Sequence, residues 1–477
     1  MRPPLHAYPS PPPDTAGSFR ARTLAARPAT PSPSTPYSAT TYAHPGYTDP
    51  EWAAFAEAER DAGLMALVRA LVLVALIGVM VFASGAVVNL LFIDIYNPTE
   101  SPAARLAWLP VYAVAGALVA ARLPIVLRQV SRAPFLVLAV LVVGLSMIWS
   151  VDPALTTRRA VALLASTCLG LGLAAALSWS RLIQGLAVAF LVLALLSFAV
   201  VLIDPGRGLM QEIYPGAWQG PWTQKNDLGG MMAKGVIAAL GALAVRPGRW
   251  WLWAPTLLLC LALVGLSTSK TALLVSVGSL GLFGWIALYR AVALLRPVLV
   301  AALLAAAGGL ALALAMFPEE MLGLIGKDPT FTGRTDIWSA LRLAIGERVW
   351  LGYGYGAFWN DPLGPSYTAR TLLQWDVPSA HNGWVEIWLH AGVGLVVLFG
   401  LHLLMVLGAC GRGLARGGAE IYWMALFTMA FVGFSLSESA ILQQNDLTWV
   451  MFVAGSVKLL AGERVPRRGA RQAVFAF

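Results

Sequence analysis

The stretch IQGLAVAFLVLALLSFAVVLI, residues 183–203, contains no charged side chain. A helix needs about 20 mostly apolar residues to cross the hydrocarbon core of a bilayer, so this stretch predicts a transmembrane helix. Comparable windows follow one another along the chain and together predict about twelve spans. Besides residues 183–203, the predicted spans are 65–90, 107–123, 133–150, 160–178, 228–246, 251–267, 271–289, 296–316, 383–408, 420–437 and 447–461. The fold class that follows is an all-α polytopic membrane protein.

The composition agrees with this fold class. Hydrophobic residues make up 58% of the 477 residues and charged residues only 12%, whereas a soluble domain has roughly 25% charged residues. The composition therefore excludes an ordinary soluble enzyme. The formal charge of +9 would suit a nucleic-acid partner, but much of the Lys and Arg lies in short clusters between apolar runs, as in polytopic membrane proteins. We expect contact with membrane lipids and no nucleic acid.

The N-terminal segment, residues 1–62, differs from the rest of the chain because it is rich in Pro, Ser, Ala and Thr. Such a composition predicts a disordered tail. The segment is too long and too polar before the first apolar run to be a cleaved signal peptide, so we expect the first helix to remain as a membrane anchor.

The positive charges predict the orientation, because short loops rich in Lys and Arg stay in the cytoplasm. The basic clusters are Arg122, Arg128 and Arg132; Arg181; Arg246 and Arg249; Arg290 and Arg296; Arg412 and Arg416; and Arg464, Arg467, Arg468 and Arg471. Their regular alternation predicts that both termini are cytoplasmic. The predicted organisation is therefore a cytoplasmic tail (1–62), nine helices (63–316), one large periplasmic loop (317–382), three helices (383–462) and a basic cytoplasmic tail (463–477).

Several basic residues fall on the predicted outer side, where the orientation rule gives no reason for them. An anionic ligand bound at that face would explain the whole set, and Arg in particular suits bidentate contact with phosphate oxygens. The alternative for each residue is that its side chain extends to lipid headgroups. The residues are Arg158, Arg159, Arg207, Lys225, Lys270 and Arg334.

Two of these cations stand in polar turns that border predicted spans. Lys225 lies in WTQKNDLGG, residues 222–230, where a polar run before a helix offers backbone N–H groups and an ammonium to an anion. The alternative is an ordinary helix cap formed by Asn226 or Asp227. Lys270 lies in STSKT, residues 267–271, where hydroxyls beside an ammonium suit a phosphate or a sugar; a satisfied turn is the alternative.

The long loop contains two further patterns. Residues 334–345 predict an amphipathic helix parallel to the membrane, with apolar residues on or near one side. These apolar residues are Ile337, Trp338, Leu341 and Leu343. The run GYGYGAFW, residues 352–359, predicts a turn that presents the rings of Tyr353 and Tyr355 to a sugar; the alternative is the aromatic belt of the membrane interface.

His381 is the single histidine of the long loop and directly precedes the tenth predicted span. Histidine is the side chain best suited to exchange a proton near neutral pH, so His381 is the candidate general base. The alternative is a structural histidine. Glu386, His390 and Glu438 are weaker candidates, because they lie in or beside spans and the sequence reveals no partner for them.

Four of these segments, in this order, resemble the O-antigen ligase and repeat-unit polymerase superfamily of bacterial envelope polysaccharide enzymes. They are QKNDLG (224–229), residues 267–270, the loop patterns around Arg334 and Tyr353, and AHNG (380–383). Each motif is short, but the order, the spacing and the single large loop make the resemblance specific. It covers approximately residues 65–460.

The resemblance implies a GT-C-like glycosyltransferase in the bacterial inner membrane, with its active site facing the periplasm. It implies an inverting, metal-independent reaction without a cofactor, in which a polyprenyl-diphosphate-linked oligosaccharide is the donor. His381 would deprotonate the acceptor hydroxyl, Asn382 would lie beside it at the substrate, and the outer basic residues would hold the diphosphate. The acceptor would be a growing polysaccharide chain or lipid A-core, and other polysaccharide export and assembly proteins are possible partners.

The departures from the family pattern favour one branch of the superfamily. Ligases commonly have Arg where this chain has Lys270, relatives with a Lys-Asn pair often have a basic residue where Gln219 stands, and Leu395 replaces a small residue or Tyr. These differences favour an exopolysaccharide polymerase of the succinoglycan type over an O-antigen ligase. Arg207 is then a candidate to supply the charge that Gln219 lacks.

A lipid-linked oligosaccharide transporter is the alternative from another functional class, since twelve spans with both termini inside is also a common transporter plan. Transporters usually contain an internal repeat and broken helices at mid-membrane. The two halves of this chain have no convincing repeat, and the one long loop makes them asymmetric. The sequence therefore favours the enzyme.

Overall fold

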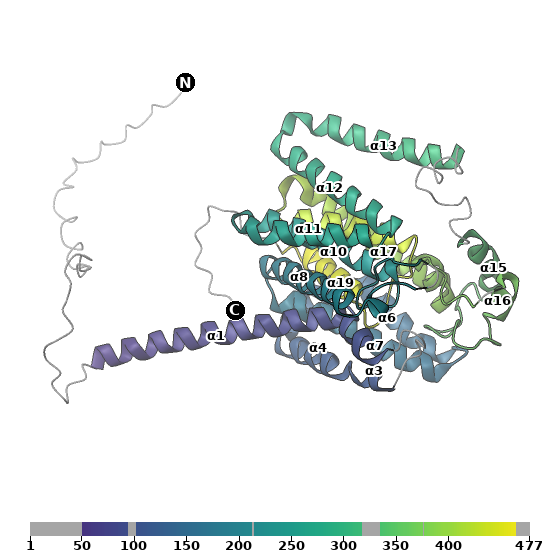
Figure 1. Cartoon of the computed structure of the whole chain (residues 1–477), viewed down its shortest axis with the longest axis horizontal. Coiled ribbons are helices and arrows are strands. Elements are labelled where there is room, and N and C mark those ends of the chain that lie inside the picture. The colour runs from purple at the N-terminus through teal and green to yellow at the C-terminus, as the bar shows by residue number, and fades with distance from the viewer. Residues whose placement is uncertain (1–49, 94–101, 212–213, 317–333, 375, 464–477) are drawn as a thin grey trace, which may run out of the picture. The chain divides into compact units, whose positions relative to one another are not determined.

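The computed structural model describes residues 50–93, 102–211, 214–316, 334–374 and 376–463 (Figure 1). Within these ranges the chain forms α-helices and short 3₁₀ helices (η), and no β-strand. Two compact units are distinguished, Met1–Ala66 and Leu67–Phe477. All the residues that carry the candidate site belong to the second unit.

Except for the start of α1, which belongs to the first unit, the helices before the long loop are part of the second unit. In chain order they are α1 (Pro50–Ala83), α2 (Ala86–Phe92), α3 (Pro102–Leu106), α4 (Leu109–Ala121), α5 (Leu123–Ser131), α6 (Pro134–Leu145), η1 (Ser146–Ile148), α7 (Pro153–Ala176), α8 (Trp179–Ile203), α9 (Pro205–Gly208), α10 (Lys225–Val245), η2 (Pro247–Arg249), α11 (Trp250–Leu266), α12 (Lys270–Ala291), η3 (Ala293–Leu295) and α13 (Arg296–Met316). The later helices are α15 (Arg334–Glu347), α16 (Tyr367–Leu373), α17 (Gly383–Arg416), α18 (Glu420–Ser435) and α19 (Leu447–Leu460).

The first helix begins earlier than the sequence predicted. Since α1 starts at Pro50, the prediction of disorder is wrong for residues 50–62. Proline suits the first turn of a helix, and the following residues are rich in Ala and Glu, which favour helix. The remainder of the predicted tail, residues 1–49, lies outside the described residues, and so does the C-terminal tail from residue 464 onward.

Every predicted span corresponds to a helix among the described residues. Eight helices are long and apolar enough to cross a membrane, and a pair bent by 98°, Leu123–Ser131 with Pro134–Ile148, would be a ninth. Three shorter apolar helices, Ala293–Gly309, Glu420–Ser435 and Leu447–Leu460, match the other predicted spans. The all-α, multi-pass membrane architecture is therefore confirmed, while the count of twelve stays a prediction.

Helix α10 lies at the centre of the second unit, packed against α8, α11, α12 and α18 (Figure 1). All residues from Leu228 to Ala242 are buried. Glycines make this close packing possible, because a Cβ at Gly229 would lie 2.6 Å from Ser267 Oγ and one at Gly241 would lie 2.7 Å from Trp423 Cβ. The N-terminus of α10, which carries Lys225, is thereby fixed between neighbouring helices.

Helix α17 is broken after its first two turns. Ala391 and Gly392 have non-helical backbone angles, with φ +76° at Gly392, a conformation that favours glycine. A Cβ at Gly392 would also lie 2.0 Å from the carbonyl oxygen of Trp350. The break frees backbone groups of α17 to bond with the long loop.

Residues 349–354 of the long loop, which include the start of the Gly/Tyr run, bond to the backbone at this break. The amides of Tyr353 and Gly354 donate to the carbonyls of Leu389 and His390 at 2.7 and 3.0 Å, and the amide of Val393 donates to the carbonyl of Val349 at 2.9 Å. Unwound backbone at membrane depth requires such partners, because a bilayer supplies none. The long loop is therefore hydrogen-bonded directly to the broken helix.

The predicted amphipathic helix of the long loop is observed as α15. Its residues Ile337, Ala340 and Leu341 are buried, but the assignment of Leu343 to the apolar side is wrong, since this side chain is 62% exposed. The residues from 317 to 333, which precede α15, lie outside the described residues.

Candidate active site

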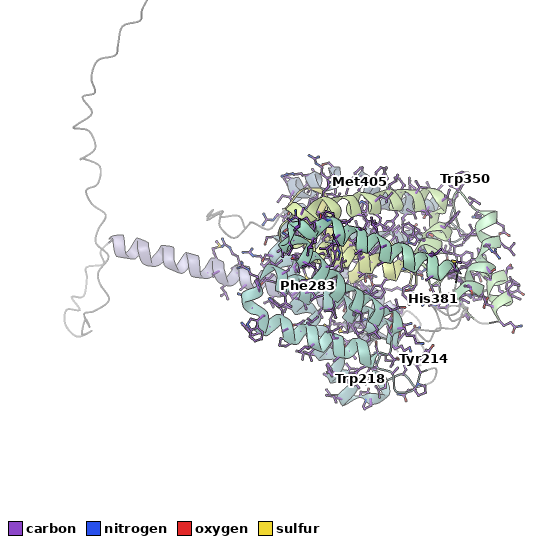
Figure 2. All side chains as sticks on the ribbon, turned by 90° about the horizontal axis from the view of Figure 1, so that it is seen from above. Tyr214, Trp218, Phe283, Trp350, His381 and Met405 are labelled. Atoms are coloured by element: carbon purple, nitrogen blue, oxygen red, sulfur yellow. The ribbon has the colours of Figure 1, made fainter. Side chains whose placement is uncertain are left out.

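His381 stands directly before the first turn of α17. Asn382 caps this helix, because its side-chain oxygen accepts hydrogen bonds from the amides of Trp384 and Val385 at 2.9 and 3.3 Å. His381 itself has φ +46°, which is uncommon for a residue other than glycine and is found where surrounding structure holds the backbone. In Figure 2 its label lies with Tyr214 and Trp350 toward one end of the helices, and Met405 lies toward the other.

The ring of His381 faces a carboxylate that in turn binds an arginine. Nδ1 of His381 lies 3.4 Å from Oε2 of Glu438, and Nη2 of Arg334 donates to Oε1 of the same carboxylate at 3.0 Å. A proton on Nδ1, directed at Glu438, leaves Nε2 as the proton acceptor, which is the arrangement of an oriented general base. Three segments that are distant in sequence meet here: the start of α15, the residue pair before α17 and the turn after α18.

Two lysines occupy the first positions of neighbouring helices. Lys225 begins α10 and Lys270 begins α12, and the two ammonium groups are close enough to repel each other. The ammonium of Lys225 donates to the hydroxyl of Thr268 at 3.2 Å and lies 3.4 Å from the centre of the Tyr214 ring. Helix N-termini attract anions, so two of them with two ammonium groups form a site suited to phosphate.

The helix cap proposed as an alternative for this segment is not formed by Asn226 or Asp227. The N-cap position of α10 is Gln224, without a side-chain hydrogen bond, and Asn226 and Asp227 are exposed on the first turn. Asp227 interacts electrostatically with both His381 and Glu438. The start of α10 and the His381–Glu438 pair therefore border the same site.

The other predicted cations lie apart from this cluster. Nη1 of Arg159 donates to the carbonyl of Gly356 at 2.6 Å, while Arg158, its neighbour in α7, is exposed and lines a cavity. Arg207 binds the end of α2: its Nη2 donates to the carbonyls of Asn89 and of Ile93, the latter at 3.1 Å. A cation at the C-terminal end of a helix stabilises that end, so Arg207 has a structural role in these contacts.

The rings of Tyr353 and Tyr355, the expected sugar contacts, pack inside the protein, and Tyr355 also lines a cavity. Both are buried, at 4% and 1% exposure. The hydroxyl of Tyr353 donates to the carbonyl of Ala344 at 2.7 Å, and that of Tyr355 donates to the carbonyl of Leu442 at 2.6 Å. Burial, assisted by Glu347, raises the pKa of Tyr353 to about 12, so its hydroxyl stays a neutral donor.

Comparison with known proteins agrees with this geometry. Residues 255–400 match the model of a family described as O-antigen ligase. The resemblance to the O-antigen ligase and polymerase superfamily is confirmed. The matched residues extend from α11 into α17, so they include Lys270, Arg334 and His381. Lys225 and Glu438 lie outside the matched residues.

The chain is also similar to the exopolysaccharide production protein ExoQ of Rhizobium meliloti (strain 1021). The two are 28% identical over 272 residues, which cover 53% of this chain and 60% of the relative. The chain therefore matches less than two thirds of the length of that protein.

The sequence reveals no partner for Glu386, but in the structure this residue supports the backbone next to His381. Its two carboxylate oxygens accept hydrogen bonds at 2.9 Å from the amide of Ala380 and from the indole of Trp359. His390 Nε2 lies 3.5 Å away. The one signal in the sequence was the four-residue spacing of Glu386 and His390, which places both on one helix face.

Glu438 is likewise a weak candidate for the catalytic site on sequence alone, because it follows a span and its partners lie far away in sequence. Its separation from His381 is 57 residues and from Arg334 is 104 residues. The packing of α17 against α18 and of α15 against α17 brings these segments together. No local pattern marks such a pair.

Proposed function

We propose that this protein is a membrane glycosyltransferase that polymerises polyprenyl-diphosphate-linked oligosaccharide repeat units into exopolysaccharide. The observation that carries the proposal is the His381–Glu438–Arg334 cluster beside the paired lysines at the starts of α10 and α12. Glycosyl transfer from a lipid diphosphate needs a base for the acceptor hydroxyl and cations for the diphosphate that leaves. The family match and the name of the similar protein support the same chemistry.

In the proposed reaction, Nε2 of His381 accepts the proton of an acceptor hydroxyl as its oxygen attacks the anomeric carbon of the donor sugar. The bond from that carbon to the diphosphate oxygen breaks, and the electron pair leaves with the lipid diphosphate. Attack opposite the leaving group inverts the anomeric configuration. Lys225 and Lys270 stabilise the negative charge that develops on the diphosphate, and no metal ion is assigned to this step.

The remaining polar residues position the reactants. Glu438 holds the His381 ring, and Arg334 holds Glu438, with its side chain only 12% exposed. Asn226, exposed on the first turn of α10, is assigned to the donor sugar or diphosphate. Asn382 acts indirectly, because its oxygen caps α17 beside His381.

Replacing Glu438 with glutamine is expected to lower kcat by about 10²-fold with little change in KM. Glutamine has no charge and only one acceptor oxygen, so it cannot accept from both Arg334 and His381 as the carboxylate does. The His381 ring is then less well oriented. Glu438→Asp, which keeps the negative charge, should restore part of the rate. Single-turnover transfer by purified protein in nanodiscs measures both. Equal rates for the wild type and Glu438→Gln would remove Glu438 from the mechanism.

We place the protein in the bacterial inner membrane with both termini in the cytoplasm and the His381 site facing the periplasm. The support is the alternation of basic loops, which stay on the cytoplasmic side. The partners in this proposal are the lipid-linked repeat unit, the growing chain and other export and assembly proteins.

The second candidate is an O-antigen ligase that transfers the glycan to lipid A-core, favoured by the description of the matching family. Purified protein given an undecaprenyl-diphosphate oligosaccharide, with and without lipid A-core, distinguishes the two. A ladder of lengthening lipid-linked glycan in both tubes supports the polymerase, and transfer only with lipid A-core supports the ligase. No product from folded protein in either tube contradicts both.

A further inference from the structure

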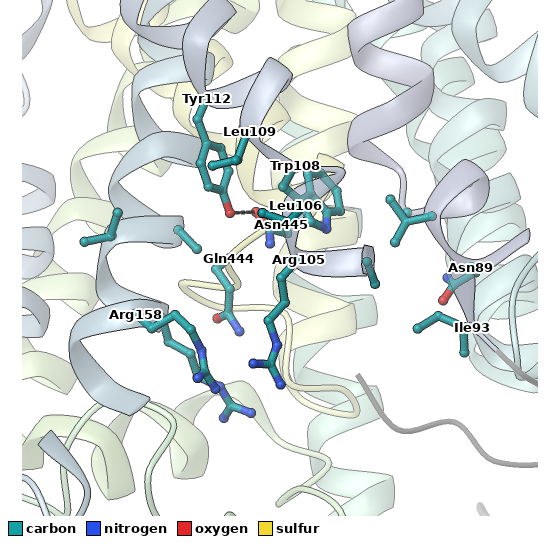
Figure 3. A pocket seen from close by; sticks show the side chains of 16 residues that line it. Asn89, Ile93, Arg105, Leu106, Trp108, Leu109, Tyr112, Arg158, Gln444 and Asn445 are labelled. Carbon is teal, nitrogen blue, oxygen red and sulfur yellow. Dashed lines mark hydrogen bonds between the residues drawn. The ribbon is translucent and has the colours of Figure 1, made fainter. Parts of the chain in front are cut away.

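A cavity of about 620 Å³ lies between α2, the α3–α4 corner, α7 and the residues before α19. Figure 3 shows the side chains of Arg105 and Arg158 directed toward the same part of this cavity, beside Gln444. Arg159 lines it as well. Three arginine side chains therefore line this cavity.

Most of the other lining residues are apolar, with Asn89, Gln444 and Asn445 as the polar amides, and the apolar part of the wall continues onto the outside of the protein. Leu106, Leu109 and Val161 line the cavity, and they are 64%, 54% and 55% exposed. In a multi-pass membrane protein such exposed apolar side chains are suited to contact lipid chains. A cavity that joins arginines to a lipid-facing apolar wall suits an anion attached to a hydrocarbon chain.

A second cavity, of about 480 Å³, adjoins the first, because Arg159 and Gln444 line both. Its wall is rich in groups that hydrogen-bond to sugar hydroxyls. They include Asn360, Asp376, Glu386, His390 and Ser439. Trp359 supplies an aromatic side chain, and such faces pack against sugar rings. The second cavity therefore suits an oligosaccharide.

The second cavity leads to the proposed base. It is lined by Ser379, whose hydroxyl oxygen lies 3.4 Å from the amide of His381. It is also lined by Ser439, which directly follows Glu438. The second cavity thus separates the first cavity, with its arginines, from His381. The lysine pair, in contrast, lies at the His381 site itself.

We propose that these two cavities bind the acceptor of the polymerase, a second lipid-diphosphate-linked oligosaccharide. The diphosphate lies at Arg105 and Arg158, and the sugars extend past Arg159 toward His381. The inference rests on the proposed function. A donor must place its diphosphate at the reacting carbon, next to the base, whereas an acceptor hydroxyl is separated from its own diphosphate by sugar units. The arrangement of the cavities fits the acceptor.

The test compares two acceptors with one lipid-diphosphate donor in nanodiscs. One acceptor is the lipid-diphosphate repeat unit, and the other is the same oligosaccharide as a water-soluble methyl glycoside. Arg105→Gln/Arg158→Gln is expected to raise KM at least tenfold for the lipid-linked acceptor and to leave KM for the donor and the glycoside unchanged. Arg158→Gln alone gives a smaller rise, and Arg128→Gln, an exposed arginine of α5, is the matched control.

A binding measurement separates failure of this inference from failure of the proposed function. Farnesyl diphosphate should bind with two equivalents to the wild type and with one to the double variant, whether or not transfer is observed. Equal binding by both proteins, an equal rise in KM for both acceptors, or a rise for the donor overturns the inference. Loss of the second equivalent when phosphatidylglycerol replaces phosphatidylcholine would assign the cavity to a phospholipid headgroup and overturn it too.

Discussion

Replacing His381 with alanine is expected to reduce the rate of glycan transfer by about 10²- to 10⁴-fold, the usual contribution of a general base. In the proposed mechanism the ring accepts the hydroxyl proton, and its Nδ1 lies 3.4 Å from the Glu438 carboxylate. Donor binding should be retained, because Lys225 and Lys270 are untouched. Product ladders and single-turnover rates, measured on protein with an unchanged melting temperature, report the effect.

The control is His44→Ala, the same change at a histidine before the first predicted span. It should leave the product ladder unchanged. A His381→Ala protein that forms wild-type ladders would show that another group removes the proton. His390 would then be the next candidate, since it lies beside Glu386 in the adjoining cavity.

Removing both lysines, as Lys225→Ala/Lys270→Ala, is expected to lower the rate by at least about 10²-fold and to weaken donor binding. The two ammonium groups are the cations at the starts of α10 and α12, and each lies where the helix end already favours an anion. The helix N-termini remain in the variant, so some affinity for the diphosphate should persist. Donor titration in single-turnover experiments separates binding from the chemical step.

Lys225→Arg/Lys270→Arg is the matched variant, because it keeps both charges. It should retain most of the donor affinity that the alanine variant loses. If the alanine and arginine variants lose the same activity, charge is not the property that these positions supply. If neither variant loses activity, the diphosphate binds elsewhere.

The helices were predictable because a bilayer imposes a strong length requirement on apolar segments. Each predicted span has a matching helix, and α15 was found from its apolar spacing. His381 stays a prediction as the general base, and it is conspicuous in the sequence because it is a lone histidine at the end of a loop in an apolar chain. Each of these features depends on residues that are close together in the sequence, so a short sequence pattern is enough to reveal it.

The features that the sequence did not reveal depend on packing between distant segments. The rings of Tyr353 and Tyr355 were expected to face a ligand, but Gly354 and Gly356 allow the turn to pack tightly against Ser150 and Arg159, which buries the rings. Arg207 was expected at the ligand, but it lies against the carbonyl groups of α2. Glu438 became a partner of His381 only through the packing of α17 and α18.

The break in α17 defines the unit that can be exchanged between relatives. The segment from Val349 to Gly354 supplies the hydrogen-bond partners for residues on both sides of Gly392, and Trp350 fits only against that glycine. A chimaera that replaces the loop alone would pair a foreign loop with the native break in α17, and the hydrogen bonds between the two would not be matched. The segment to exchange between relatives therefore extends from α15 to Val393. We expect the first turns of α17, together with the loop, to determine which substrate is preferred.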